Sequence, residues 1–272
     1  MRWINRQPGP GGRLALGALP FVLLGLAYLA GSALRLAEDP NDKLLPALTS
    51  LAAAVDLMAF TPDRRTGEYL LWTDTAASLL RLGAGLGLSA VLALAVGMAA
   101  GLLPLARAAL APLVAFVSMV PPLALLPVLF ILLGLGETSK IALIVIGVAP
   151  ILIRDLAMTA QAIPREQIVK AETLSASTWL IGLHVVLPQV APRLIDGLRL
   201  QLGPAFLFLI AAEAISADSG LGYRSFLVRR YLSMDIIFPY VAWITLLAVL
   251  MDLGLALIRR RLFPWAELER AR

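Results

Sequence analysis

The chain contains no cysteine and a single histidine, His184. Without cysteine it can form no disulfide, thiolate metal site or cysteine nucleophile, and one histidine cannot build a histidine metal site. The sequence also lacks the G-x-x-x-x-G-K-[ST] motif of a phosphate-binding loop and the G-x-S-x-G motif of a serine nucleophile. We therefore expect no metal site, no cofactor, no ATP site and no enzyme active site on this chain.

Charged residues are scarce as well, at 15% of 272 residues, whereas soluble domains average about 25%. Hydrophobic residues make up 60% of the chain, and the mean hydropathy is +0.85. This composition excludes disorder, collagen and coiled coil. Arginines stand at the ends of apolar runs, which argues against nucleic-acid binding. At about 20 apolar residues per membrane crossing, the sequence predicts an all-α polytopic membrane protein.

Six apolar stretches are long enough to cross a membrane, and we expect six transmembrane helices. They lie near 14–34, 82–106, 108–136, 139–160, 194–215 and 236–257. The first follows Arg2, Arg6 and Arg13. Its length exceeds the apolar core of a signal peptide, which is about 7–15 residues. A retained helix is therefore favoured over a cleaved signal.

Six helices place both chain ends on one side of the membrane. With the N-terminus inside, the inner segments hold 14 of the 23 basic residues and 7 of the 18 acidic ones. Because basic residues gather in cytoplasmic loops, we expect both termini in the cytoplasm. The expected order is a cytoplasmic N-terminus (1–13), a first transmembrane helix (14–35), a periplasmic segment (36–76), a core of five transmembrane helices (77–265) and a cytoplasmic tail (266–272).

Two segments are expected on the outer surface. The first, 36–76, carries seven acidic residues against three basic ones, and Leu45–Phe60 within it could form a helix along the membrane surface. The second is Ser219–Asp235, with Gly220 near its start.

Glycine and proline modify two of the apolar stretches. Small residues in the second stretch predict close helix packing in lipid; they are Gly83, Gly85, Gly87, Gly97 and Gly101. The third stretch is interrupted after Met119 by Val120-Pro121-Pro122, where proline removes backbone donors. Irregular backbone at membrane depth must be buried in protein or line a cavity. This segment is thus a candidate pathway or gate, with a simple proline kink as the alternative.

Arg199 and Glu213 flank the apolar centre of the fifth stretch. A charge at mid-bilayer costs at least about 2.5–3.5 kcal/mol on insertion scales. The two residues lie about 21 Å apart along a helix, so they cannot pair with each other. They either line the pathway or gate, or they are interfacial charges paired with a neighbour.

The expected cytoplasmic loop, 160–193, has the pattern of two short helices joined at Ser175-Ala176-Ser177. In the first of these helices Ile168, Ala171, Leu174 and Ser175 share one face at three- and four-residue spacing. Such an elbow suits a docking surface for a soluble partner, and a plain connector is the alternative.

This loop resembles the coupling motif of ABC importer permeases, E-A-A-x-x-x-G followed after nine residues by I-x-L-P. The motif positions fall at Val169-Lys170-Ala171, Ser175, Val185 and Leu187-Pro188. The spacing and the Leu-Pro end are kept, whereas the glutamate, the first alanine and the glycine are replaced. If the glycine position needs positive φ, Ser175 would constrain the turn. The resemblance implies an ATPase-coupling role for Arg165, Val169, Lys170, Ala171, Leu174, Ser175, Ala176, Ser177, Trp179, Leu187 and Pro188.

Further segments are similar to the nitrate, sulfonate and taurine subgroup of these permeases. They are Val120-Pro121-Pro122, Gly134-Leu135-Gly136-Glu137, Gly197-Leu198-Arg199, Ala212-Glu213, Ser219-Gly220-Leu221-Gly222-Tyr223 and Arg260-Arg261-Leu262-Phe263-Pro264-Trp265. The resemblance covers roughly residues 44–265 and implies the type I ABC importer permease fold.

The resemblance also implies partners. Such permeases act as dimers, here expected to be a homodimer, in the bacterial inner membrane. Two cytoplasmic ATPase subunits carry the ATP and Mg, and a periplasmic binding protein delivers the substrate. The expected substrate is a small polar solute, either a nitrate-, sulfonate- or taurine-like anion or a small nitrogenous compound. A secondary transporter and a membrane scaffold that transports nothing remain alternatives.

Overall fold

The computed structural model describes residues 9–39 and 42–266. These residues form helices joined by turns, and no strand occurs among them. The longer helices are α1 (Pro10–Glu38), α2 (Leu48–Ala59), α3 (Leu70–Leu92), α5 (Pro104–Met119), α7 (Glu137–Gln161), α10 (Leu187–Ser216) and α12 (Met234–Leu262). The shorter ones are η2 (Ala93–Gly97), α4 (Met98–Leu102), η3 (Pro122–Leu125), α6 (Leu126–Leu133), α8 (Arg165–Thr173), α9 (Thr178–Ile181), η4 (Gly182–Val186), α11 (Leu221–Val228) and η5 (Arg229–Tyr231).

Five helical units in the described part of the chain are long and apolar enough to cross a membrane. They are α1, the continuous stretch Leu70–Leu102, α7, the stretch Thr178–Ser216 and α12. The pair α5 and α6 meets the same criteria together but is bent by 85°. If this bent pair is counted as a single span, the described residues contain six spans, which agrees with the number predicted from the sequence.

Two of the spans begin earlier than the charge pattern predicts. The second begins at Leu70 rather than near 82, and the fifth at Thr178 rather than near 194. The helical turns before residue 82 carry Asp74 and Arg81, the charged residues that come just before the uncharged run in the sequence. Both side chains are buried with oppositely charged partners, and a paired charge is far less costly inside a helix bundle than a lone one.

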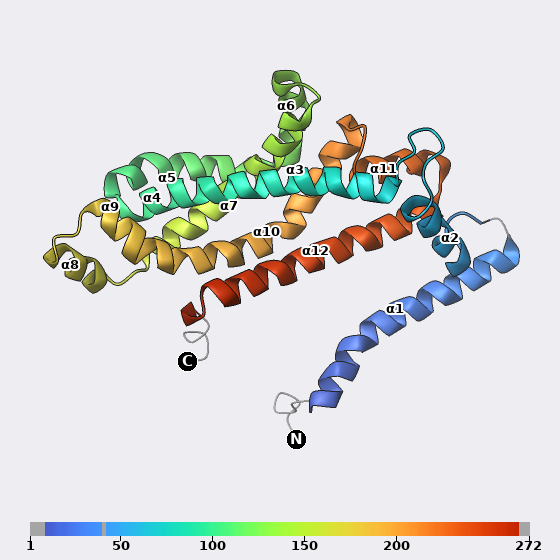
Figure 1. The fold of residues 1–272 in the computed structure, drawn as a ribbon, viewed down its shortest axis with the longest axis horizontal. Helices are drawn as coiled ribbons and strands as arrows, with labels where there is room; N and C mark the ends of the chain where they lie inside the picture. The colour runs from blue at the N-terminus through green and yellow to red at the C-terminus, as the bar shows by residue number, and fades with distance from the viewer. Residues whose placement is uncertain (1–8, 40–41, 267–272) are drawn as a thin grey trace.

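Helix α7 lies at the centre of the bundle, packed between the span containing α3 and α10 (Figure 1). Glycines make the close approach to α3 and α4 possible. A Cβ on Gly85 would come within 2.6 Å of Ile144, and one on Gly101 within 2.4 Å of Ala160. A Cβ on Gly97 would likewise come within 2.9 Å of Leu156. The predicted close packing is therefore confirmed for these three glycines, whereas Gly83 and Gly87 face open space.

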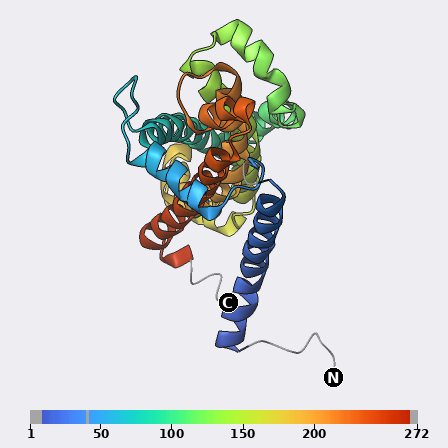
Figure 2. The ribbon, with the colours of Figure 1, turned by 90° about the vertical axis from the view of Figure 1, so that its right-hand side faces the viewer.

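Helix α1 stands apart from the rest of the bundle along most of its length (Figures 1 and 2). Its most apolar window is 0% buried. Its contacts gather near its C-terminal end, where the Tyr28 hydroxyl donates to the Pro46 carbonyl at 2.7 Å and the Ser32 hydroxyl donates to the Leu45 carbonyl at 3.0 Å. The first span is therefore tethered to its own bundle mainly through the segment leading into α2.

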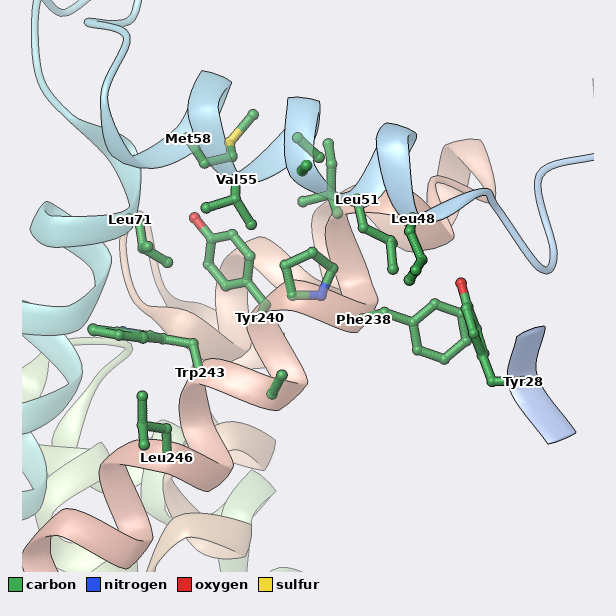
Figure 3. Close-up of a pocket in the computed structure, with 15 residues that line it drawn as sticks. Tyr28, Leu48, Leu51, Val55, Met58, Leu71, Phe238, Tyr240, Trp243 and Leu246 are labelled. Atoms are coloured by element: carbon green, nitrogen blue, oxygen red, sulfur yellow. The ribbon is translucent and has the colours of Figure 1, made fainter. Parts of the chain in front are cut away.

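Helix α2 corresponds to the surface helix predicted at Leu45–Phe60. It lies across the N-terminal end of α12 and covers an apolar crevice of about 590 Å³. Figure 3 shows Val55 and Met58 of α2 above Tyr240 and Trp243 of α12, with Tyr28 of α1 at the far end. Within the described part of the chain no charged side chain lines this crevice, so it has the character of a lipid-facing seam rather than a path for a polar solute.

Candidate functional site

The predicted coupling segment forms a helix, a tight turn and a second helix. Helix α8 ends in a Schellman turn, in which the Ala176 amide donates to the Ala171 carbonyl at 3.0 Å and the Ser175 amide donates to the Glu172 carbonyl at 2.9 Å. The Ser177 hydroxyl then caps α9 by accepting from the Leu180 amide. Backbone N–H and C=O groups at the end of α8 and the start of α9 thus find hydrogen-bond partners within residues 165–179. These bonds give this helix–turn–helix segment, the elbow, a defined shape.

Ser175 occupies the position in this turn that glycine normally fills. Its φ is +59°, in the left-handed region. A residue with a Cβ is strained there by about 1–2 kcal/mol. The predicted constraint at Ser175 is therefore confirmed, and the backbone keeps the turn despite the loss of glycine.

The elbow presents apolar side chains outward. Leu174 is 83% exposed and Trp179 is 73% exposed, and Val169 beside them is also exposed. Large apolar side chains gathered on one loop mark an interaction surface more often than a solvated connector. This arrangement supports the docking interpretation.

A few contacts attach the elbow to the bundle. Gln189 of α10 donates to the Gln167 side chain of α8 at 2.9 Å, and its amide nitrogen also lies 2.7 Å from the Val185 carbonyl. On the inner face Ala171 and Ala176 pack against the hydrophobic core. Leu187 and Pro188 open α10 directly after the π-helical turn η4. A displacement of α8 would therefore be transmitted to α10.

The predicted pathway segment lies at the break between α5 and α6. Met119 is the last residue of α5, Val120 and Pro121 are extended, and Pro122 opens the 3₁₀ turn η3. Beyond η3, α6 leaves at 85° to α5 (Figure 1). The prolines thus end one helix and redirect the chain, which is a larger effect than a kink within a continuous helix.

Glu213 lies in a buried ion cluster that joins three spans. Its side chain is 0% exposed and accepts hydrogen bonds from the Arg81 guanidinium at 2.6 Å, the Ser78 hydroxyl at 2.8 Å and the Gly222 amide at 2.8 Å. Arg81 also pairs with Glu137 at the start of α7, and Lys140 donates to Glu137 at 3.0 Å. The buried charges of this cluster are therefore compensated, as their position requires.

A second cluster fastens α11 to the start of α3. Asp74 is fully buried and accepts from Arg224 at 2.8 Å, from the Gly220 amide at 2.9 Å and from the Tyr240 hydroxyl at 3.1 Å. Burial is the largest single effect on Arg224 and opposes its charged form, but the hydrogen bond to Asp74 and the charge of that carboxylate, with smaller contributions from Tyr240 and Tyr223, together raise the pKa of Arg224. The segment Ser219–Asp235 is thus held in place by the Arg224–Asp74 ion pair as well as by packing.

Arg199 lies apart from the break and from the Glu213 cluster. It forms a two-pronged pair with Asp252 of α12, at 2.7 and 2.9 Å. The structure therefore separates the six predicted pathway or gate residues into three places: the break, the Glu213 cluster and the α10–α12 contact. Arg199 and Glu213 are each paired with an oppositely charged neighbour, as one of the two interpretations predicts. A role of either residue in the pathway stays a prediction.

Sequence reasoning missed the partners Asp74, Arg81, Glu137 and Arg224. A signal for two of them was present, because Asp74 and Arg81 stand next to an otherwise apolar run. Their partners lie 56 to 150 residues away in the chain, and no local pattern reports such a pairing. Among the described residues no group of three His, Cys, Asp or Glu side chains could hold a metal ion.

Comparisons with known proteins agree with this geometry. Residues 89–264 match the family described as "Binding-protein-dependent transport system inner membrane component". The taurine transport system permease protein TauC of Escherichia coli is 36% identical over 227 residues, which cover 83% of this chain and 79% of TauC. The bicarbonate transport system permease protein CmpB of Synechocystis is 32% identical over 197 residues, covering 72% of this chain and 70% of CmpB.

A third relative and two solved structures extend the comparison. The aliphatic sulfonates transport permease protein SsuC of Escherichia coli, whose function is designated putative, is 34% identical over 147 residues, 54% of this chain and 56% of SsuC. Two structures of the MetNI methionine ABC transporter superimpose with TM-scores of 0.56 and 0.58 at 20% and 18% identity. They cover 67% and 70% of this chain and 93% and 96% of the matched chains. The fold of the described residues is therefore that of ABC importer permeases.

Proposed function

The chain belongs to the family of binding-protein-dependent transport system inner membrane components, and from this premise we propose how it works as the membrane-spanning permease of an ABC importer. The observation that carries the proposal is the elbow at 165–179, a rigid turn with exposed Leu174 and Trp179 at its tip. The tip supplies a docking surface for an ATPase carried on another chain, on which ATP and Mg are bound. This fits a chain without a phosphate-binding loop of its own.

The proposed complex contains two copies of this chain, two cytoplasmic ATPase subunits and a periplasmic substrate-binding protein. It lies in the inner membrane of a bacterium, with both termini of the permease in the cytoplasm. Binding of ATP closes the ATPase pair and shifts the two elbows. Each elbow acts on α10 through the Gln167–Gln189 hydrogen bond and the packing of Ala171 and Ala176. The helix bundle then exchanges between two conformational states. The ATPase at one end of the bundle and the binding protein at the other both shift the equilibrium between these states.

The proposed substrate is a small polar solute of the taurine, sulfonate or nitrate kind, or a small nitrogenous compound. Relatives named for taurine, aliphatic sulfonates and bicarbonate support this class. The solute would pass near the α5–α6 break, where Val120 and Pro121 leave backbone groups outside regular helix. Such backbone is tolerated at membrane depth where it lines a water-filled cavity.

The test is a charge placed at the tip of the elbow. Leu174→Asp should leave the complex assembled enough to purify, but should reduce ATP-driven uptake at least tenfold, because an apolar contact with the ATPase is replaced by a carboxylate that must be desolvated. Uptake would be measured in proteoliposomes that contain the permease, its ATPase and its binding protein.

Leu57→Asp is the matched control, since Leu57 is an exposed leucine on α2 at the other end of the molecule. Its uptake should stay within twofold of the wild type. Equal uptake by Leu174→Asp and the wild type would contradict the coupling assignment. Uptake by the chain alone, without ATP, would favour a secondary transporter, and no uptake with any partner would favour a scaffold.

A further inference from the structure

We propose that α6 is a contact surface for a second copy of this chain. Two of its residues, Leu126 and Leu129, are buried against the bundle. Apolar side chains on its other sides point outward, with Ile131 83% exposed and Leu132 72% exposed. A helix that is apolar on all sides is stable where all of its sides are covered. The outer sides of α6 therefore need a partner.

Lipid alone does not fit the surroundings of α6. The segment is preceded by the irregular stretch Val120–Leu125 and followed by Gly134, whose φ is +78°. Glu137 comes directly after, with a side chain 57% exposed. It pairs with Arg81, eleven residues inside the span that begins at Leu70, or about 16 Å from the end of that span. Irregular backbone and a half-exposed carboxylate at that depth face protein or water rather than hydrocarbon.

Water does not fit the tip of α6 either, since the exposed apolar side chains of Val128, Ile131 and Leu132 would be left in contact with it. Protein is the covering that suits both the apolar tip and its polar base. The cytoplasmic ATPase is excluded by position, because α6 and the elbow around α8 lie far apart in the molecule (Figure 1). A soluble binding protein is excluded by depth, because the base of α6 is joined through Glu137 to Arg81, about 16 Å inside its span. A second copy of this apolar chain is the remaining occupant.

In the dimer each copy would place α6 against the other, as a two-fold interface requires. The apolar tip, Ile131 and Leu132, would be buried in the partner. The base, Glu137 with Arg81 and Lys140, would remain at the edge of the space between the copies. This inference rests on the proposed homodimer and adds the surface by which the copies meet.

A photoreactive phenylalanine analogue at Leu132 tests the contact in native membranes that hold the complete transporter. We expect irradiation to produce an adduct with twice the mass of the chain. An adduct with lipid, with the binding protein or within one chain would overturn the inference. Copies carrying two different affinity tags would be purified through one tag in the same experiment. If they co-purify without the Leu132 adduct, the homodimer stands and the role of α6 is wrong; if they do not co-purify, both are wrong.

A second pair of variants does not depend on the photoreactive residue. The double change Ile131→Ala and Leu132→Ala should weaken co-purification of the two tagged copies about tenfold or more, because truncated apolar anchors dominate the loss of affinity at interfaces. The matched control is Leu250→Ala with Leu253→Ala, two exposed leucines of α12. An equal yield of paired copies from both double variants would overturn the inference.

Discussion

Arg81 and Glu213 show how this membrane-spanning chain keeps charges inside its bundle. Both side chains are buried, and each has a charged partner and further hydrogen bonds. Gly220 completes the arrangement, because its φ is +133° and a Cβ added there would come within 2.6 Å of the Glu213 carboxylate oxygens. The cluster thereby fixes the turn that leads from α10 into α11.

Glu213→Ala should destabilise the protein by about 3–5 kcal/mol, because it leaves the Arg81 charge buried without one of its partners. The measurement is thermal unfolding of the detergent-solubilised chain. Asp155→Ala is the matched control, since it breaks an ion pair with Arg193 that is partly exposed and worth about 0–1 kcal/mol. Similar losses in the two variants would contradict the assignment of a buried structural pair.

Ser175→Gly should stabilise the elbow by up to about 1 kcal/mol, because glycine adopts a positive φ without steric cost. Hydrogen exchange at the Ala176 amide, which closes the turn on Ala171, should slow about fivefold. Ser175→Val should have the opposite effect, since β-branched residues are least tolerant of this conformation. Identical exchange rates in the three proteins would show that the turn is not limited by residue 175.

The residue-scale predictions from sequence succeeded where the signal is local. The spacing of the coupling motif located the elbow, and the substitution at Ser175 identified the strained position. The partner of Glu213 was not found, because Arg81 lies 132 residues away. Long-range pairing of this kind depends on the packed arrangement of α3 and α10, which a single sequence does not report.

At the scale of helices, small residues decide which spans can approach each other. Gly101 lies against Ala160 on α7, whereas Gly87 of the same span faces open space. The sequence predicts close packing for both, because composition does not distinguish the two faces of a helix that is apolar on every side. The span boundaries show a related effect, since Asp74 and Arg81 conceal the twelve helical residues 70–81 from a search for uncharged runs.

Gly101→Val should destabilise the chain by about 1–3 kcal/mol, because the new side chain overlaps Ala160 and forces α4 away from α7. Gly87→Val, one of the five glycines of the same span, is the control and should have little effect. The comparison is made by thermal unfolding in detergent. If Gly87→Val were equally harmful, the loss would reflect helix propensity or an uncharacterised contact rather than the α4–α7 approach.

For the whole molecule, the expected topology places α8 and the two chain ends on the cytoplasmic side and α2 with α11 on the other. Figure 1 shows α2 and α11 together at one end of the molecule, with α8 at the opposite end. With the bent pair α5–α6 counted as one span, the described residues give six spans, an even number that agrees with the expectation of both termini on one side. The expectation that this side is cytoplasmic rests on the bias of basic residues toward the segments near Arg165 and Arg259–Arg261.

The absence of cysteine makes this topology directly testable, because each introduced cysteine is the sole thiol of the chain. Leu174→Cys at the elbow and Arg230→Cys beyond α11 are both exposed positions. In spheroplasts a membrane-impermeant maleimide should label Arg230→Cys and leave Leu174→Cys unlabelled. Inside-out vesicles without the ATPase should give the reverse, because the elbow then faces the reagent with nothing docked on it. Labelling of both cysteines from one side would require an even number of crossings between residues 174 and 230, so the span Thr178–Ser216 would need reassignment before any coupling mechanism could stand.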